Sequence, residues 1–555
     1  MFWQQLFAKK TLEQLAAEAK GENRLRRVLG PIGLTSLGVG AIIGAGIFVM
    51  TGRAAAQDAG PAIIISYCVA GLGCLFAALC YAEFASAAPV AGSAYTYAYA
   101  TLGELFAWFI GWDLILEYAM ACACVASSWS KYLNEFLNPF GVHVPAQISY
   151  DPFTLAEKGY GGIIPGANLM AVLIIVACTI VLVIGIRESA TTNAILVGVK
   201  LGVVLFVIGV GLFYVSQSNW TGVPPSERLH AESATEKWGI LGYVGLDRFL
   251  LPIDNSVRTN FTPYGLSGIM LGAAIVFFAY IGFDSISTHS EEAKRPHRDV
   301  PLAILASLIL CTLLYIGVAA VITGMVPYPK IDPNAAVASA FREKGEATDS
   351  ALLRWSGFLI ATGALAGMTS VLLITFLSQA RIFLAMARDG LLPPGIFGAI
   401  HERFRTPHLS TMLTGGLIAV VAAFTPITKL EEMVNIGTLA AFVIVCAAVL
   451  VLRIKRPDAP RPFRTPLVYL VAPAGILVNL IMMLFLPLDT WLRLVGWLVV
   501  GLCLYFGYGF WNSTIGKMMR FGPAFARAEA ALGRAPAVAG NGEAAIKAKE
   551  EGVTE

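Results

Sequence analysis

The sequence predicts an all-helical integral membrane protein, and two observations carry this prediction: the composition and a series of long apolar runs. The 555 residues are 57% hydrophobic and only 14% charged, whereas a soluble domain carries about 25% charged residues. A soluble chain of this length could not bury so much apolar surface in one core, but a bilayer can cover it. Runs of about 20 apolar residues, the length that crosses a bilayer, recur along the chain.

Twelve apolar runs reach or approach that length. They lie at 31–52, 61–88, 103–130, 167–186, 194–215, 265–288, 300–325, 353–380, 409–424, 432–452, 467–487 and 493–513. The ninth run is short, so a tilted or misassigned span is the alternative there. The chain therefore divides into an amphipathic cytoplasmic lead at 1–30, a twelve-helix domain at 31–515 and a cytoplasmic tail at 516–555. Four apolar residues of the lead are able to lie on the membrane surface: Phe2, Trp3, Leu6 and Phe7.

Lysine and arginine are distributed unevenly between alternate loops. With the N-terminus in the cytoplasm, the inside segments hold 25 of them and the outside loops hold 13, a bias that predicts both termini inside. The polar start of the chain lacks the apolar core of a cleavable signal peptide, so we expect a multi-pass protein of a bacterial inner membrane. The net charge of +3 follows from this topology and indicates no nucleic-acid partner.

Two runs carry glycines where an ordinary spanning helix would not. Residues 38–46 contain four glycines, and the sixth run adds Gly268, Gly272 and Gly282. Each costs a helix about 1 kcal/mol relative to alanine, and glycine-interrupted segments at matching places in two halves point to a transporter binding site. The shift of five helices predicts an inverted five-plus-five repeat with helices 1 and 6 broken, followed by two extra helices. Close packing of small residues is the alternative explanation.

A broken helix exposes backbone groups that suit a zwitterion. Free amides at the start of the second half attract an anion, so Gly44, Ala45 and Gly46 are candidates for a substrate carboxylate. The carbonyls of Ile42 and Ala279 are candidates for an ammonium group. An α-amino acid carries both charges, which makes it the expected cargo. The predicted binding segments also include Ile43, Ile47 and Ile281.

Four ionisable residues fall inside the predicted spans, where they are costly and therefore functional candidates. We expect Glu117 to face the substrate ammonium or to titrate, and Asp284 to load and release a proton. Lys200 would be a fixed cation at the place where a sodium-coupled carrier holds its ion. Glu83, near the inner end of its run, is expected to reach the interface. A structural ion pair is the alternative for each.

Six segments carry a resemblance to a known family. They read GAIIGAGIF at 40–48, YAEF at 81–84, PVAGSAYTY at 89–97, FFAYIGFD at 277–284, SEEAKRPHRDVP at 290–301 and QARIFLAMARDGLLP at 379–393. Together they resemble the amino acid–polyamine–organocation superfamily, and within it the bacterial members of the cationic amino acid transporter subfamily. The resemblance covers nearly the whole predicted membrane domain.

The resemblance implies alternating-access transport through a broken-helix fold. It implies that Phe278, which could otherwise be a packing residue, gates the pocket and that Glu117 lines it. It also implies that Lys200 replaces a coupling sodium ion and that Asp284 takes part in proton coupling. Ala45 stands where some relatives have threonine, so one polar contact to the carboxylate is absent.

Met368 in the eighth run matches a pocket position that is smaller and polar in relatives with long cationic substrates. A long methionine there shortens the pocket, which favours small or medium neutral amino acids such as alanine. The alternative is that Met368 faces lipid or another helix.

The expected function is proton-coupled symport of L-amino acids across the bilayer. The alternatives are a cationic amino acid or polyamine exchanger and, less favoured, a non-transporting membrane sensor. No nucleophile–base pair, phosphate loop or metal spacing indicates an enzyme or a cofactor, and the nine cysteines are interpreted as apolar filler. The sequence does not decide whether a small single-helix membrane protein accompanies the chain.

Overall fold

The computed structural model describes residues 2–10, 29–87, 93–159, 166–185, 190–223, 240–241 and 259–522. Within these ranges the regular structure is helical, apart from one isolated parallel bridge between Leu29 and Ala293. Eight helical runs of the described chain are long and apolar enough to cross a membrane, and four shorter apolar helices accompany them. The expected all-helical, multi-span architecture is confirmed at this level.

The apolar helices correspond in position to the predicted runs. They are α3 (Pro31–Ile42), α5 (Ile63–Ala87), α7 (Glu104–Leu137), α10 (Leu169–Ile184), α11 (Ala190–Gly211), α16 (Gly265–Val276), α18 (Pro296–Met325), α20 (Ala351–Arg388), α22 (His408–Phe424), α23 (Ile427–Lys455), α24 (Val468–Leu484) and α25 (Leu488–Leu504). Both α7 and α20 extend beyond the predicted runs, because charged residues that end an apolar stretch do not break a helix.

Shorter helices connect or flank these elements. They are α1 (Phe2–Leu6), α4 (Thr51–Ala54), α6 (Ser93–Thr101), α8 (Ala146–Ser149), α9 (Pro152–Glu157), α12 (Ser218–Thr221), α17 (Ser285–Thr288), α19 (Ala336–Ala347), α21 (Pro394–Phe397), α26 (Phe510–Asn512) and α27 (Thr514–Phe521). The segment between the seventh and eighth predicted runs, 326–352, contains a helix, α19. Most of the segment between the fifth and sixth predicted runs, 216–263, lies outside the described residues.

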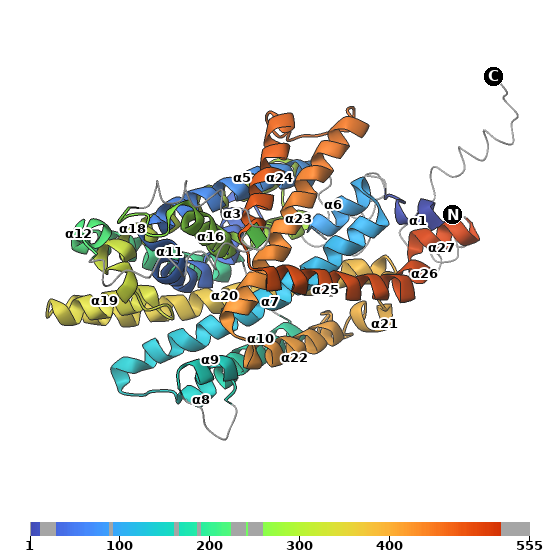
Figure 1. Ribbon diagram of the computed structural model, residues 1–555. Coiled ribbons are helices and arrows are strands. Elements are labelled where there is room, and N and C mark those ends of the chain that lie inside the picture. The colour runs from blue at the N-terminus through green and yellow to red at the C-terminus, as the bar shows by residue number, and fades with distance from the viewer. Residues whose placement is uncertain are drawn as a thin grey trace, which may run out of the picture.

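The helices pack into one bundle in which α7 is central. It lies along α20 and α23, while α18 lies along α5 and α3. On one side of the bundle α10 and α22 run next to each other (Figure 1), and α19 packs against the N-terminal part of α20. The ionisable residues that α7 carries are therefore held between neighbouring helices.

Two of the helices are interrupted at the predicted glycines. Helix α3 ends at Ile42, Ile43 is extended, and a π-helical turn η1 (Gly46–Met50) follows. Helix α16 gives way to a 3₁₀ turn η7 (Phe277–Tyr280), an extended residue and then Gly282 with φ of 119°. Only glycine adopts that φ without strain.

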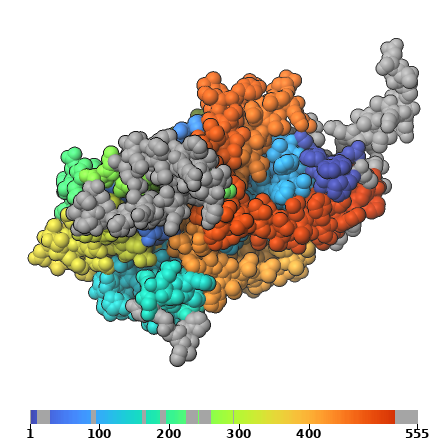
Figure 2. All heavy atoms as spheres, in the orientation of Figure 1, coloured from blue at the N-terminus to red at the C-terminus, as the bar shows by residue number. Residues whose placement is uncertain are grey.

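The described part of the N-terminal lead packs on protein. Gln5 Nε2 donates to the Phe510 carbonyl at 2.7 Å, and Leu6 is buried. Figures 1 and 2 show α1 lying against the C-terminal segment that includes α26 and α27. The expectation that Leu6 lies on the membrane surface is therefore wrong, although Phe2, Trp3 and Phe7 remain exposed. Residues 11–28 and the tail from 523 lie outside the described residues.

Candidate functional site

The two interrupted helices touch each other at their breaks. A Cβ atom on Gly46 would lie 2.3 Å from the Ala279 Cα, and one on Gly282 would lie 2.8 Å from the Ala41 carbonyl oxygen. Real Cβ atoms do not come so close to backbone, so both positions require glycine. The predicted carboxylate-binding and ammonium-binding segments are thereby brought together in the bundle.

Tyr315 of α18 joins the carbonyl groups at the two breaks. Its hydroxyl lies 3.0 Å from the Ile42 oxygen and 2.8 Å from the Ala279 oxygen. A hydroxyl has one hydrogen to donate, whereas each carbonyl has two lone pairs. The two carbonyls therefore keep acceptor capacity for an ammonium group. Sequence reasoning missed Tyr315, because a tyrosine within an apolar run carries no pattern of its own.

Lys200 lies at the end of the first half-helix. Its Nζ donates to the Gly40 carbonyl at 2.7 Å, and the side chain is fully buried. A cation at a helix C-terminus interacts favourably with the helix dipole. The structure thus places the buried Lys200 side chain within one turn of the break in α3.

Two of the predicted acids lie in the bundle with carboxylate oxygens that have no hydrogen-bond partner. Both Oε atoms of Glu117 are buried and unpartnered, as is Oδ1 of Asp284. Asp284 Oδ2 accepts a hydrogen bond from the Tyr118 hydroxyl at 2.6 Å. Tyr118 follows Glu117 on α7, so this helix carries one of the two acids and also donates the hydrogen bond to the other, Asp284.

Glu83 has a different environment. Arg453 donates to both of its carboxylate oxygens at 2.8 and 2.9 Å, and the Thr465 amide donates at 2.8 Å. Arg461 Nε lies 3.2 Å from Oε1. The carboxylate is fully buried, so the expectation that Glu83 reaches the interface is wrong. The alternative, a structural ion pair, describes it.

Sequence reasoning also missed Asp113. It lies one helical turn before Glu117 on α7, is 5% exposed, and its Oδ1 has no hydrogen-bond partner. A Cβ atom on Gly437 would lie 2.9 Å from that oxygen, so the carboxyl occupies space that the glycine of α23 leaves free. The signal available was the spacing Asp-x-x-x-Glu, which puts both acids on one helix face.

A second ion pair lies where α4 meets α23. Arg53 pairs with Glu431 between the two helices, and Glu431 is buried. Five residues before Arg53, the Phe48 carbonyl accepts a hydrogen bond from the Tyr132 hydroxyl of α7 at 2.8 Å. These contacts tie the second half of the first interrupted helix to α23 and α7.

Helix α20 covers the break in α3. A Cβ atom on Gly44 would lie 2.8 Å from Val371 Cγ2, and one on Gly367 would lie 3.5 Å from Lys200 Cε. Met368, between these contacts, is fully buried, so it lies inside the bundle and not against lipid. The remaining predicted site residues are also buried: Ile43, Ala45, Ile47, Phe278 and Ile281. The site is therefore closed to solvent in this conformation.

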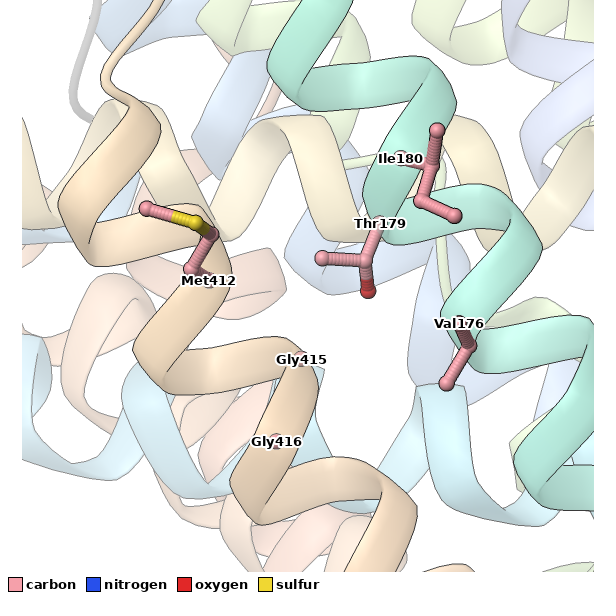
Figure 3. A pocket seen from close by; sticks show the side chains of 6 residues that line it. All are labelled: Val176, Thr179, Ile180, Met412, Gly415 and Gly416. Atoms are coloured by element: carbon pink, nitrogen blue, oxygen red, sulfur yellow. The ribbon is translucent and has the colours of Figure 1, made fainter.

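An apolar groove lies elsewhere, between α10 and α22 (Figure 3). Its volume is about 220 Å³, and its lining residues are Val176, Thr179, Ile180, Met412, Gly415 and Gly416. None of the predicted site residues lines it.

Among the described residues no group of three or more His, Cys, Asp or Glu side chains is arranged to hold a metal ion.

Comparison with known proteins decides the family. The amino acid permease family matches residues 29–507, which is most of the chain. The chain belongs to this family, within the amino acid–polyamine–organocation superfamily. The permease is 41% identical over 512 residues to the branched-chain amino acid permease BcaP of Bacillus subtilis (strain 168), a match that covers 92% of this chain and 99% of that protein.

Two other relatives widen the range of named substrates. The permease is 40% identical over 512 residues to the methylthioribose transporter of the same organism, with the same coverage of both chains. It is 35% identical over 468 residues to cationic amino acid transporter 4 of Mus musculus, covering 83% of this chain and 64% of that one. The resemblance seen in the sequence is confirmed, and the family is one of transporters and not of enzymes.

Proposed function

We propose that this permease is a secondary active transporter that imports L-amino acids together with protons by alternating access. The observation that carries the proposal is the contact between the two interrupted helices, with the Lys200 ammonium at the end of the first half-helix. This arrangement offers backbone groups of both signs in one buried place, which suits a zwitterion.

In the proposed bound state the two charges of the substrate are held by the two breaks. The amides from Gly44 to Gly46 begin a helical segment and lack intrahelical acceptors, so they hold the carboxylate. The carbonyls of Ile42 and Ala279 hold the ammonium with their remaining lone pairs. Phe278, in the adjoining 3₁₀ turn, covers the substrate and moves when the site opens.

The proposed driving force is the proton gradient. Lys200 places its ammonium group beside the break, which makes a sodium ion there unfavourable. Glu117 and Asp284 are buried with unpartnered oxygens, and an uncompensated negative charge within a membrane is costly. Each therefore binds a proton readily, and alternate exposure to the two sides of the membrane lets it take up and release that proton.

The proposed cargo is a small or medium neutral amino acid such as alanine. Met368 is buried beside residues that contact the break and Lys200, where its length limits the space for a side chain. The name of the branched-chain relative supports a neutral, apolar cargo. The cationic transporters among the relatives keep a cationic exchanger as the second candidate.

The proposed topology has twelve transmembrane helices. The first ten form an inverted five-plus-five repeat, with the interruptions at 43–45 and 277–284 in helices 1 and 6, and α24 and α25 follow it. The domain spans 31–515, and both termini lie on the cytoplasmic side of the inner membrane, as the distribution of basic residues indicates.

The test is uptake by the full chain in sealed liposomes with labelled alanine, leucine, arginine or methylthioribose. Three conditions are compared: a pH gradient that drives protons inward, a gradient that drives sodium inward, and no gradient. We expect accumulation of alanine or leucine under the pH gradient alone. Uptake that occurs only against preloaded substrate would favour the exchanger, and arginine or methylthioribose as the best substrate would contradict the proposed cargo.

A further inference from the structure

Asp113 is the one buried acid of α7 near the site to which the proposed mechanism gives no role. We infer that Asp113 is a further proton-holding group, which passes protons between Glu117 and the end of α7 that begins at Glu104. This inference rests on the proposed proton coupling and deepens it, because it gives the coupled proton a path along one helix.

The first argument is placement. Asp113 and Glu117 are four residues apart, so their side chains lie on one face of α7, separated by a rise of about 6 Å. The Glu117 carboxyl also lies within electrostatic range of Asp284 and Asp113. Glu117 therefore interacts electrostatically with both of the other two acids inside the bundle.

The second argument is the lack of hydrogen-bond partners. Oδ1 of Asp113, both Oε atoms of Glu117 and Oδ1 of Asp284 are buried and unpartnered in the described structure. Thr438 lies beside Glu117, but its hydroxyl donates to the Val434 carbonyl at 2.9 Å. A negative charge on such a buried, unpartnered oxygen is costly, so each acid can hold a proton.

Three arginines on the helices around α7 pair with acids other than Asp113. Arg453 of α23 pairs with Glu83, Arg381 of α20 pairs with Glu292, and Arg493 of α25 pairs with Asp489 and Glu432. Tyr95 and Tyr99 of α6 donate to Asp389 and Glu104, while α10 and α22 contribute Cys178 and His408. The resulting surroundings of Asp113 favour a neutral carboxyl.

The third argument is direction. Asp113 lies nine residues after Glu104, about 13 Å along the helix. Glu104 accepts hydrogen bonds from the hydroxyls of Tyr99 and Tyr505 at 2.9 and 2.8 Å. Trp112 stacks on Trp497 with ring centroids 4.5 Å apart, and this pair covers the neighbouring face of α7. Asp113 thus lies between the central acids and a polar helix end.

The transfer step is a simple exchange of a proton. Because neither Glu117 oxygen has a hydrogen-bond partner in the described structure, one of the two side chains first rotates to bring the carboxyls together. Protonated Glu117 then gives its proton to the Asp113 carboxylate, so one O–H bond breaks on Glu117 as one forms on Asp113. The negative charge moves in the opposite direction, and no other reactant is consumed. Only one of the two acids is charged at any time, which keeps the cost of burial low.

The test compares two transport modes of the full chain in liposomes. Net uptake of alanine under a pH gradient requires the proton to leave after each cycle. In exchange of alanine at equal pH, the carrier returns with substrate bound, so it does not need to release its proton. We expect Asp113→Asn to lower net uptake by about tenfold or more, to leave exchange within about twofold, and Asp113→Glu to restore net uptake.

Asp489→Asn is the matched control, because that aspartate is half-exposed and paired with Arg493; it should behave as wild type in both modes. The inference is overturned if Asp113→Asn transports as wild type in both modes, or if it loses both modes equally, which indicates a structural role. If the wild type itself shows no pH-driven uptake, the proposed function fails along with the inference.

Discussion

Glu83 and Glu117 are both buried glutamates of apolar helices, yet their surroundings are opposite. Two arginines and a backbone amide contact the Glu83 carboxylate, whereas neither oxygen of Glu117 has a partner. Burial makes each of them costly, but only the partners show whether that cost is offset inside the protein. We therefore propose that Glu83 serves stability and that Glu117 serves transport.

The largest effect expected from this comparison is the loss of stability in Glu83→Ala. Removing the carboxylate leaves Arg453 and Arg461 without their shared partner, and Arg461 is deeply buried. Breaking a buried ion pair in this way costs about 3–5 kcal/mol. Thermal unfolding in detergent measures it, and a variant as stable as wild type would contradict the assignment.

Glu117→Gln should affect transport and not stability, the reverse of Glu83→Ala. The amide keeps the shape of the side chain but cannot release a proton, so we expect unchanged thermal unfolding and a loss of pH-driven alanine uptake of about tenfold or more. Both quantities are measured on the same preparation as Glu83→Ala. If Glu117→Gln unfolds as early as Glu83→Ala, the distinction between the two glutamates is wrong.

His289, five residues after Asp284, is a buried base just outside the span. Its Nδ1 lies 2.8 Å from the Ser285 carbonyl, and burial, then Arg381, lower its pKa from 6.5 to about 3. Because the unfolded chain binds the proton first, stability is fully present above pH 6.5 and is lost as the pH falls toward 3.

His289→Gln should therefore lose less stability than wild type on acidification. One pH unit below 6.5 the difference amounts to about 1.4 kcal/mol, and unfolding midpoints at pH 7.5 and 5.5 measure it. Equal losses in the two proteins would show that burial in the folded state does not lower the pKa of His289.

The smallest effect concerns cargo. Met368→Ser shortens the side chain beside the break and should improve competition by arginine about fivefold relative to alanine, about 1 kcal/mol of binding. Competition for labelled alanine uptake measures the ratio. If arginine already competes better than alanine in the wild type, Met368 does not set the preference.

The sequence predicts those features that depend on local pattern. Glycine spacing locates both interruptions, and the apolar context of Lys200 and Glu117 identifies them as buried ionisable residues. Features that depend on distant contacts are not predictable in this way. Arg453 lies 370 residues from Glu83, and Tyr315 reaches Ile42 across 273 residues; no local pattern connects such pairs.

The central claim, that unpartnered buried acids couple amino-acid entry to proton entry, is tested most directly by measuring luminal pH. Liposomes containing the full chain and a trapped pH indicator, with equal pH and no sodium on either side, receive external alanine. We predict that alanine entry acidifies the lumen for the wild type and for Asp489→Asn but not for Glu117→Gln. Alanine entry without acidification in the wild type would contradict the account.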